Sequence, residues 1–349
     1  MEARHLDADV IVVGGGPGGA SAAIACATRG LKVCLLERSR KAEERPGETL
    51  HPGVEPLLSQ LGVGDRLESV VGARHPGIWV DWGKQRRFVA FGGDAVGPWS
   101  GYQVRRAEFD ALLLARAAEV GVVIKRPCAV TGVCPSDGRR HGVLTSAGPL
   151  TARMLVDATG RARALCRMRG LACPAYSSRL VANYGYVGGS CPVRDDAPAL
   201  VGDAFGWTWT AMVRPGLYQW TRLSFSGPID PYWMPEEFQG LPILRRTRGV
   251  DVSWRMPSRV AHDGWFLVGD AAATLDPASS HGVLRSIMSG MMAGHLIGAV
   301  LAGTAPESEA ARAYHDWVAQ WFQADLARMK TFYADLGVSV LAGPDSAHE

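Results

Sequence analysis

Strand-like and helix-like patterns of apolar residues alternate at the start of the chain. Residues 10–13 are all apolar and β-branched, which is typical of a buried strand. A glycine cluster follows at 14–19, then an alanine-rich helical segment at 20–28 and a second apolar strand at 32–36, which ends at Glu37. This order of strand, tight turn, helix and strand predicts a βαβ unit with parallel strands.

Further along, residues 54–61 and 106–120 carry apolar side chains at helical spacing, with Phe109 and Ala117 on one face of the second segment. Residues 77–91 are strand-like and rich in aromatic side chains. Short strands separated by Gly and Pro are expected at 122–125, 130–134, 142–146 and 154–156.

The pattern changes between about 171 and 257. This stretch combines several tryptophans, many Gly and Pro residues and alternating positions at 217–225, which predicts an antiparallel sheet with long loops. An apolar strand at 265–268 follows, then helices at 282–301 and about 307–336. We therefore expect an α/β fold, in which a Rossmann-like domain is interleaved with an antiparallel-sheet domain and followed by a C-terminal helical segment.

Composition narrows the class of protein. The 349 residues are 47% hydrophobic and 20% charged, with a net charge of +3, so we expect neither a disordered chain nor a nucleic-acid binder. The seven cysteines form no Cys-x-x-Cys pair, which predicts no metal site and favours a reducing compartment. We see no signal-peptide pattern and no apolar stretch of about 18 residues that would span a membrane. A cytoplasmic protein is expected.

The glycine cluster has the spacing of a dinucleotide-binding turn. Gly14, Gly16 and Gly19 follow the first strand, with Pro17 and Gly18 between the last two. The first glycine permits a tight turn, the second lets the backbone approach a pyrophosphate, and the third lets helix and strand pack closely. Glu37 lies 18 residues after Gly19, where an acid can accept hydrogen bonds from an adenosine ribose.

Two later segments favour FAD over a nicotinamide dinucleotide. Asp157 to Gly160 and the pair Gly269 and Asp270 each close a predicted strand. Ligands bind at the carboxyl ends of strands in open α/β sheets. An acid at that place can bond the hydroxyls of a ribityl chain, which a nicotinamide cofactor does not have.

These motifs together resemble a known family. In order, they are Gly14–Gly19 with Glu37, Gly47-Glu48-x-Leu50-x-Pro52, Arg106-x-x-Phe109-Asp110, Asp157–Gly160, and Gly269-Asp270 followed by Asp276-Pro277 and Gly282. The chain resembles FAD-dependent monooxygenases of the para-hydroxybenzoate hydroxylase type. The closest branch looks like the flavin-dependent halogenases and the flavoprotein maturases that modify tryptophan for quinone cofactors.

The resemblance implies a glutathione-reductase type of FAD-binding domain made of three separate segments. We expect FAD-binding parts at 7–80, 104–170 and 258–300, substrate-lobe strands at 81–103, an antiparallel substrate domain at 171–257 and C-terminal helices at 301–349.

The resemblance also implies roles for single residues. Asp270 would contact the ribityl or pyrophosphate part of FAD, and Arg106 the diphosphate or ribityl side. Two alternatives stay open: Asp270 as a helix cap, and Arg106 paired with Glu108 or Asp110. Arg38, beside Glu37, is a further candidate for cofactor binding.

Residues 276–283 are the segment with the clearest mechanistic role. A helix beginning near Gly282 and Val283, after Pro277, would direct free N–H groups at the flavin N1 and C2 carbonyl, where reduced flavin carries negative charge. His281 is a candidate proton donor. Glu48 and His51, in the segment expected over the flavin, are further catalytic candidates, although Glu48 could instead position the flavin or cap a helix.

Aromatic residues suggest a substrate site. Trp207 and Trp209 resemble the first half of the halogenase Trp-x-Trp element, but the sequence continues with Thr210-Ala-Met instead of the halogenase residues. Two residues apart on a strand, their side chains point the same way. They and Trp82 are candidates for binding an aromatic substrate, with core packing as the alternative for the tryptophan pair.

Halogenases of this type carry a lysine shortly before a tryptophan in the strand region after the Gly-Glu element. Here Arg74 or His75 stands in that region, and the nearest lysine, Lys84, follows Trp82 instead. The chain is also shorter than we expect of a halogenase. These features predict a monooxygenase that hydroxylates an electron-rich, indole-like ring through a flavin C4a-hydroperoxide, with halogenation as the alternative.

The remaining expectations concern partners and other functions. The substrate is expected to be a small aromatic molecule or a peptide or protein residue. The co-substrate is molecular oxygen, and NAD(P)H or a separate flavin reductase supplies electrons. Two further alternatives are a geranylgeranyl-reductase-like FAD enzyme that saturates isoprenoid double bonds, and a non-catalytic FAD-binding protein.

Overall fold

The computed structural model describes residues 6–41, 45–46, 48–83, 85–135, 140–225 and 229–338. The strands are β1 (Ala8–Val13), β2 (Val33–Leu36), β3 (Thr49–Leu50), β4 (Val71–His75), β5 (Gly77–Trp82), β6 (Arg87–Ala90), β7 (Gly101–Val104), β8 (Val123–Lys125), β9 (Val130–Cys134), β10 (His141–Thr145), β11 (Gly148–Asp157), β12 (Val181–Gly188), β13 (Ala199–Asp203), β14 (Gly206–Arg214), β15 (Leu217–Ser224), β16 (Ile243–Asp251), β17 (Ala261–His262) and β18 (Trp265–Leu267).

The α-helices are α1 (Pro17–Ala27), α2 (Val54–Gln60), α3 (Arg106–Glu119), α4 (Ala164–Met168), α5 (Pro192–Asp195), α6 (Gly282–Leu301) and α7 (Glu307–Ala334). Short 3-10 helices are η1 (Gly64–Val70), η2 (Gly160–Ala162), η3 (Glu236–Phe238), η4 (Gly269–Ala271) and η5 (Pro277–Ser279).

A parallel sheet forms the centre of the nucleotide-binding domain. Its strand order is β17-β18-β11-β1-β2-β8, in which only β17 runs antiparallel to its neighbour, and β10 and then β9 extend β11 as antiparallel strands. The neighbours of β1 run parallel to it on both sides, with Val13 opposite Asp157 and Leu36. Because this sheet is covered on both faces, β1 and β2 are apolar along their whole length instead of alternating.

Helix α6 packs closely on α1 because both helices carry small residues at the contact. A Cβ atom on Gly290 would lie 2.3 Å from the Gly18 carbonyl oxygen, and one on Gly294 would lie 2.6 Å from the Ala25 Cβ. Helix α6 is the one helix, within the described residues, that is long and apolar enough to cross a membrane. By its length and composition, α6 contradicts the expectation that the chain has no apolar stretch of this size. Its close packing on α1 nevertheless makes α6 a core helix of the nucleotide-binding domain.

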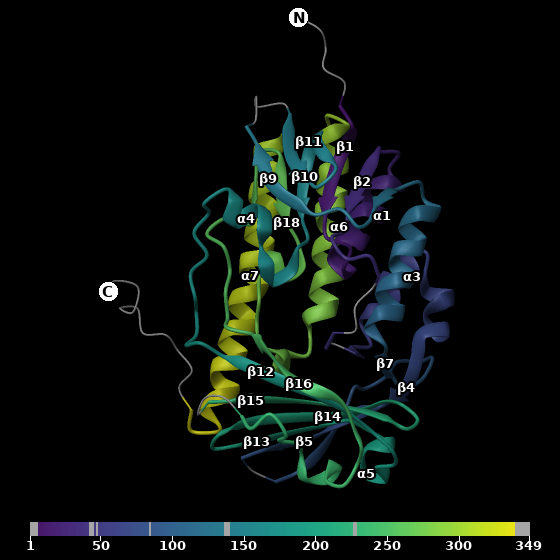
Figure 1. The fold of residues 1–349 in the computed structure, drawn as a ribbon, viewed down its shortest axis with the longest axis vertical. Helices are drawn as coiled ribbons and strands as arrows, with labels where there is room; N and C mark the ends of the chain where they lie inside the picture. The colour runs from purple at the N-terminus through teal and green to yellow at the C-terminus, as the bar shows by residue number, and fades with distance from the viewer. Residues whose placement is uncertain are drawn as a thin grey trace, which may run out of the picture.

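A second, seven-stranded sheet lies below the first in Figure 1, with the order β16-β12-β15-β14-β13-β5-β6. Strand β5, from early in the chain, pairs in parallel with β13 and so joins distant segments. A small sheet of order β3-β7-β4 completes the strands. The predicted α/β class, with a Rossmann-like domain, a separate sheet domain and a C-terminal helical segment, is confirmed.

Helix α7 links the two domains along one side of the molecule (Figure 1). Near its start, the Tyr314 hydroxyl donates a hydrogen bond of 2.7 Å to the Leu267 carbonyl at the end of β18. Near its end, Tyr333 is 1% exposed and contacts residues of the second sheet. Phe322, between them, is fully buried. The helix thus fixes the position of one sheet relative to the other.

Candidate functional site

The glycines in the turn after β1 differ in the space around them, which shows where a ligand can approach the backbone. Gly14 has φ +109°, and a Cβ there would lie 2.3 Å from the Ala158 carbonyl oxygen. A Cβ on Gly19 would lie 2.0 Å from the Gly14 carbonyl oxygen, and Gly18 faces α6. A Cβ on Gly16 would meet nothing within 4 Å. Gly14, Gly18 and Gly19 therefore serve packing, while Gly16 leaves open space at the start of α1.

The first turn of α1 is suited to an anion. Gly16 is its N-cap, Pro17 occupies the first turn, and no side chain caps the helix. The first N–H groups of a helix have no partner within it and carry partial positive charge, so they bind phosphate groups. An open glycine, free N–H groups and the neighbouring bare backbone fit the pyrophosphate of a dinucleotide.

Glu37 fastens the turn to the end of β2. Its Oε2 accepts a hydrogen bond of 2.7 Å from the Gly15 N–H, and its Oε1 accepts one of 2.8 Å from the Ser39 N–H. Each carboxylate oxygen has a second lone pair for another donor, such as a ribose hydroxyl. Arg38, by contrast, is exposed and does not line the neighbouring pocket.

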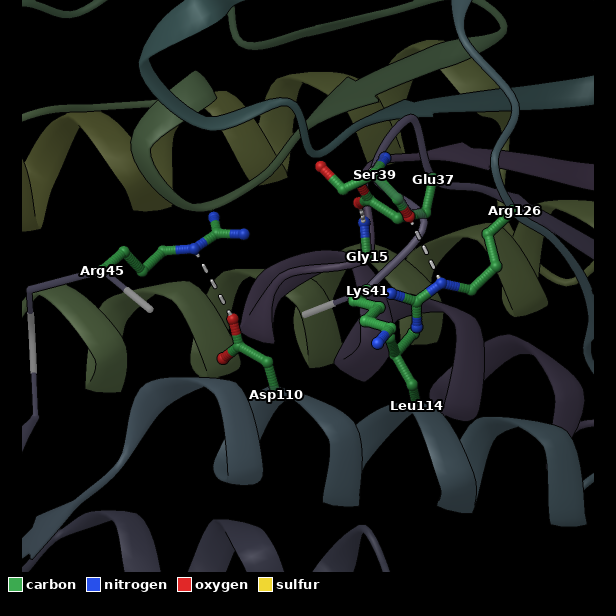
Figure 2. A pocket seen from close by; sticks show the side chains of 8 residues that line it. All are labelled: Gly15, Glu37, Ser39, Lys41, Arg45, Asp110, Leu114 and Arg126. Atoms are coloured by element: carbon green, nitrogen blue, oxygen red, sulfur yellow. Dashed lines mark hydrogen bonds and ion pairs between the residues drawn. The ribbon is translucent and has the colours of Figure 1, made fainter. Parts of the chain in front are cut away.

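Figure 2 shows this pocket beside Glu37. It is lined by Gly15, Glu37, Ser39, Lys41, Arg45, Asp110, Leu114 and Arg126. Arg126 donates to the Ser39 carbonyl at 3.3 Å, and Arg45 lies 3.9 Å from Asp110. The three cations at the pocket can bind the phosphate oxygens of an adenosine phosphate, and the Glu37 carboxylate can accept hydrogen bonds from its ribose hydroxyls. Lys41, Arg45 and Arg126 were not identified from the sequence, because they share no motif spacing with the glycines.

Arg106 is held by its own helix. It is buried and forms an ion pair with Asp110 at 3.1 Å, four residues on, and it donates to the Pro46 carbonyl at 3.2 Å. The pairing with Asp110 is thus the alternative that the sequence left open, although it lies in the interior and not on the helix surface. Through Pro46 the guanidinium also fastens the segment that precedes Glu48.

Asp157 faces the protein, away from any open space. It is 1% exposed. Its Oδ1 accepts from the N–H and hydroxyl of Thr159, and its Oδ2 accepts from the N–H groups of Leu165 and Cys166. These four bonds use the lone pairs of the carboxylate. In place of the expected cofactor contact, Asp157 holds the turn that exposes Gly160, which has φ +63° and no atom within 4 Å of a Cβ.

The second acid, Asp270, lies at an accessible position. It belongs to η4 and is paired with Arg161 of η2 at 3.2 Å, each side chain being about one-third exposed. Gly269, before it, has φ +59° and donates its N–H to the Ser289 hydroxyl at 2.9 Å. Asp270 therefore does not simply cap a helix. Arg161 was missed by the sequence analysis, because only the fold brings η2 beside η4.

Helix α6 begins at Gly282 without a side-chain cap. The first N–H within the helix that finds a carbonyl partner is that of Arg285, which bonds His281 at 2.8 Å. The N–H groups at Gly282 and Val283 belong to the set without a partner inside the helix. A Cβ on Gly282 would meet nothing within 4 Å. This helix end, after the η5 turn at Pro277, can hold a second anionic group.

Two histidines that are far apart in the sequence meet at this helix end. The rings of His51 and His281 lie 5.3 Å apart. His51 Nδ1 accepts from the Gly53 N–H at 3.0 Å, and His281 Nδ1 is buried without a hydrogen-bond partner among the described residues. Burial lowers the pKa of both, and the charge of His51 lowers that of His281 further. Both rings are therefore largely neutral near pH 7.

Glu48 joins the two domains. It is 3% exposed, and its Oε1 accepts a short hydrogen bond from the Tyr186 hydroxyl on β12 of the second sheet. Its carbonyl accepts from the Val104 N–H at 2.9 Å. Gly47, its neighbour in the motif, lies outside the described residues.

A buried hydrogen-bonded chain lies behind the start of α6. Asp276 is fully buried, and its Oδ2 accepts from the Tyr333 hydroxyl at 2.6 Å and from Trp254 Nε1 at 3.1 Å, while its Oδ1 accepts from the Ala278 N–H. Trp207 Nε1 donates in turn to the Tyr333 oxygen at 2.8 Å. Burial raises the pKa of Asp276 to about 6, against the opposing effect of these donors.

The candidate substrate tryptophans pack inside the protein. Trp207 is fully buried, and its indole contacts Tyr333. Trp82 is 6% exposed and stacks on Phe332 with 3.6 Å between ring centroids. Trp209 is half-buried against the same core. For Trp207 and Trp82 the packing explanation holds, because α7 covers the face of the sheet from which they project.

The residues in the region of the halogenase lysine have other partners. Arg74 pairs with the exposed Glu68. His75 is buried between the Gly77 carbonyl and the Gln103 amide, and burial lowers its pKa to about 4. Neither side chain is placed as a nucleophile. Lys84, the alternative, lies outside the described residues.

Comparison with known proteins agrees with this geometry. Residues 7–162 match the family model of an FAD binding domain. The 1H-pyrrole-2-carbonyl-[peptidyl-carrier protein] brominase of Pseudoalteromonas luteoviolacea is 26% identical, over 98% of this chain and 90% of that protein. The tryptophan 2-halogenase of Chondromyces crocatus is 28% identical, over 87% of this chain, which spans 64% of that halogenase.

Other similar proteins include a reductase and a solved halogenase. The digeranylgeranylglycerophospholipid reductase of Thermoplasma acidophilum is 28% identical, over 82% of this chain and 76% of that enzyme. The solved structure of the myxobacterial chondrochloren halogenase, described as a new variant of FAD-dependent halogenases, superposes with a TM-score of 0.85 at 25% identity, over 97% of this chain and 84% of that one.

These relatives overturn the predicted hydroxylation. Several relatives that match most of the chain are named halogenases and not hydroxylases. The argument from length fails as well, since the chain spans 90% of a brominase. Length failed as a criterion because halogenases differ in length, and this chain spans 64% of the tryptophan 2-halogenase but 90% of the brominase. The chain binds FAD, is an enzyme of the FAD-dependent oxidoreductase type, and has relatives that support its place in the superfamily of FAD-dependent aromatic monooxygenases and halogenases.

Proposed function

We propose that this protein is a flavin-dependent halogenase of an electron-rich aromatic substrate. The observation that carries the proposal is the match along nearly the whole chain to a pyrrole brominase. Strands β12 to β16 of the second sheet, which lie beyond residues 7–162 of the FAD binding family model, are part of that match. Similarity that extends over the substrate side is the kind that bears on the reaction, whereas a shared Rossmann domain bears only on the cofactor.

The residues for FAD are distributed over three segments. The pyrophosphate would lie at the N-terminus of α1 beside Gly16, and the adenosine would occupy the pocket of Figure 2 with its ribose at Glu37. Asp270 would accept from the ribityl chain, and its Arg161 partner would lie near the phosphates. The N-terminus of α6, at Gly282 and Val283, would stabilise the negative charge of reduced flavin.

Bound as the reduced anion, FAD would supply two electrons, with which dioxygen, a halide ion and two protons would give oxidised FAD, hypohalous acid and water. The hypohalous acid then exchanges its halogen for a ring hydrogen and releases a second water. The protein has to deliver the protons and exclude bulk water. His281 and His51 are placed to relay a proton, since their rings meet at the start of α6. Both are neutral near pH 7, so each ring can accept a proton at one nitrogen while the other nitrogen gives one up.

The substrate and the electron donor follow from the same proposal. We infer an aromatic substrate such as a pyrrole or indole, either free or attached to a carrier, as the name of the brominase relative states for that protein. A separate flavin reductase that uses NAD(P)H would supply reduced FAD. The glycine turn at 14–19 is the site for FAD itself, and the sequence contains no second motif of that kind for a nicotinamide dinucleotide.

Product analysis tests the proposal. The FAD-loaded protein is incubated with a flavin reductase, NADH, oxygen, bromide and pyrrole or indole compounds. We expect products with the paired isotope masses of bromine, and none when oxygen is removed. A product that gains the mass of one oxygen and contains no bromine would contradict the proposal and indicate hydroxylation instead. Saturation of an isoprenoid double bond without oxygen would favour the activity of the reductase relative.

The role of lysine is tested in the same assay. Lys84 is the lysine nearest to the region where halogenases carry theirs. We expect Lys84→Ala to abolish bromination while FAD binding is retained, with Lys330→Ala on the exposed face of α7 as the matched control. Full activity of Lys84→Ala would show that this enzyme directs its halogen without that lysine.

A further inference from the structure

An irregularity in the second sheet gathers arginines beside two tyrosines. Tyr184 and Tyr186 on β12 share one face, being two residues apart. Their partners on the edge strand β16 are Arg248 and Arg245, which are three residues apart. In a regular strand, residues three apart point to opposite faces. The bulge in β16 therefore brings both arginines to the tyrosine face, and bulges often redirect side chains next to functional sites.

These residues form a small pocket with one sign of charge. It is lined by Tyr184, Tyr186, Arg245, Arg246 and Arg248. The three arginines are exposed, and within the described parts of the chain none of them pairs with a carboxylate. The Arg245 guanidinium lies 5.7 Å from the centre of the Tyr186 ring. Arg222 on the same sheet, by contrast, is neutralised by Asp203 at 2.7 Å.

The pocket is connected to the candidate reaction site by one side chain. Tyr186 places its ring beneath Arg245 and its hydroxyl on Glu48. Glu48 stands directly before β3, three residues from His51, whose ring meets His281. In Figure 1, β12 and β16 lie on the side of the second sheet that is nearer to the nucleotide-binding domain.

We propose that Arg245, Arg246 and Arg248, with Tyr184 and Tyr186, bind an oxyanion carried by the aromatic substrate. The inference rests on the halogenase proposal for the position of the reacting ring. Guanidinium groups bind carboxylate and phosphate oxygens with two parallel hydrogen bonds, and the Tyr186 ring supports the Arg245 guanidinium from one side. An oxyanion held here leaves the ring of the substrate free to reach toward Glu48 and the histidines.

The oxyanion has two chemical sources. One is the carboxylate of a free aromatic acid. The other is the phosphate ester of a tether that carries an aromatic acyl group. A carboxylate presents two oxygens in one plane, and a phosphate presents oxygens in a tetrahedral arrangement. Arginines bind both, so the two sources are distinguished by comparing a carboxylate probe with a phosphate probe, and the same arginine variant serves for both.

Binding to the FAD-loaded protein tests the subsite without any halogenation. Pyrrole-2-carboxylate, neutral pyrrole-2-carboxamide and S-(pyrrole-2-carbonyl)-4′-phosphopantetheine are titrated by calorimetry. We expect at least one anionic probe to bind tenfold or more tightly than the carboxamide. The double variant Arg245→Ala/Arg248→Ala should abolish that difference, and added salt should reduce it. If the phosphopantetheine probe binds more tightly, the site is assigned to a phosphate ester. If the carboxylate probe binds more tightly, the site is assigned to a free aromatic acid.

The control lies at the opposite edge of the same sheet. Arg87 on β6 is also an exposed arginine of an edge strand, so Arg87→Ala should leave every affinity unchanged. Equal affinities for charged and neutral probes, or equal losses in both variants, would overturn the subsite and leave the arginines as charges that protect an edge strand. Bromination of neutral pyrrole, measured in parallel, reports separately on the halogenase proposal.

Discussion

The Tyr333 hydroxyl donates a hydrogen bond of 2.6 Å to the Asp276 carboxylate, and so joins the last turn of α7 to the turn before α6. Both side chains are buried. Asp276 in turn receives the Ala278 N–H at 2.9 Å and shapes η5, after which α6 begins. The C-terminal helix therefore supports, from behind, the helix end that we propose to face the flavin.

Removing this hydrogen bond should loosen the turn. In Tyr333→Phe, the Trp207 indole N–H loses its acceptor and Asp276 loses a donor. A buried polar group without a partner costs about 1–3 kcal/mol, so we expect a loss of that size in the free energy of unfolding, together with weaker FAD binding. Chemical denaturation and flavin titration measure the two effects. Tyr232→Phe, at a 76% exposed position, is the control; an unchanged Tyr333 variant would contradict the proposed support.

Asp276 should make stability depend on pH. Burial raises its pKa to about 6 in the folded protein, above the ordinary value of 3.8. Between these values the folded state holds a proton that the unfolded state has lost, so this contribution to stability is complete below about pH 4 and is lost as the pH rises through 6. Relative to Asp276→Asn, the wild type should lose up to about 3 kcal/mol over that range.

The comparison requires denaturation curves at several pH values for wild type and variant. The difference between the two isolates Asp276 from the histidines, whose lowered pKa values act with the opposite sign below pH 6.5. Asp263→Asn, at an exposed position, should show no such difference. A constant difference between Asp276→Asn and wild type would mean that the buried carboxyl stays ionised throughout.

A substitution at Gly16 should impair cofactor binding without impairing folding. A Cβ there meets no atom within 4 Å, so Gly16→Ala should fold with the melting temperature of the wild-type apoprotein. The added methyl group would occupy the space of the pyrophosphate, and we expect FAD affinity to fall at least tenfold, measured by flavin fluorescence. Gly19→Ala should destabilise the apoprotein itself, because its Cβ would lie 2.0 Å from the Gly14 carbonyl oxygen. Normal FAD binding by Gly16→Ala would place the pyrophosphate elsewhere.

His281 should matter for turnover and not for folding. Its Nδ1 is buried and free of any partner among the described residues, and halogenation consumes protons in each cycle. We expect His281→Ala to lower the rate of bromination by about a hundredfold or more, as general acid–base groups do, with FAD binding retained. His262→Ala, at an exposed position on β17, is the control. Wild-type rates in His281→Ala would remove this histidine from the mechanism.

The cofactor half of this protein could be predicted from its sequence. Apolar runs without alternation, a glycine spacing and an acid after the second strand all lie within residues 8–37, and each is a local pattern. Gly19 is constrained within this unit, because its Cβ would lie 2.0 Å from the Gly14 carbonyl oxygen. Gly14 is marked by its positive φ, although the atoms that a Cβ there would meet belong to Ala158, at the end of the strand beside it.

Tertiary structure decided the rest, because it depends on contacts between distant segments. The meeting of His51 with His281, the ion pair of Arg161 with Asp270 and the bond from Tyr333 to Asp276 join residues 57 to 230 positions apart, which no spacing rule encodes. Packing likewise assigned Trp82 and Trp207 to the interior, since a strand pattern shows which face a side chain takes but not that α7 covers that face. Asp157 has the right place in the sequence, yet four local donors turn its carboxylate inward.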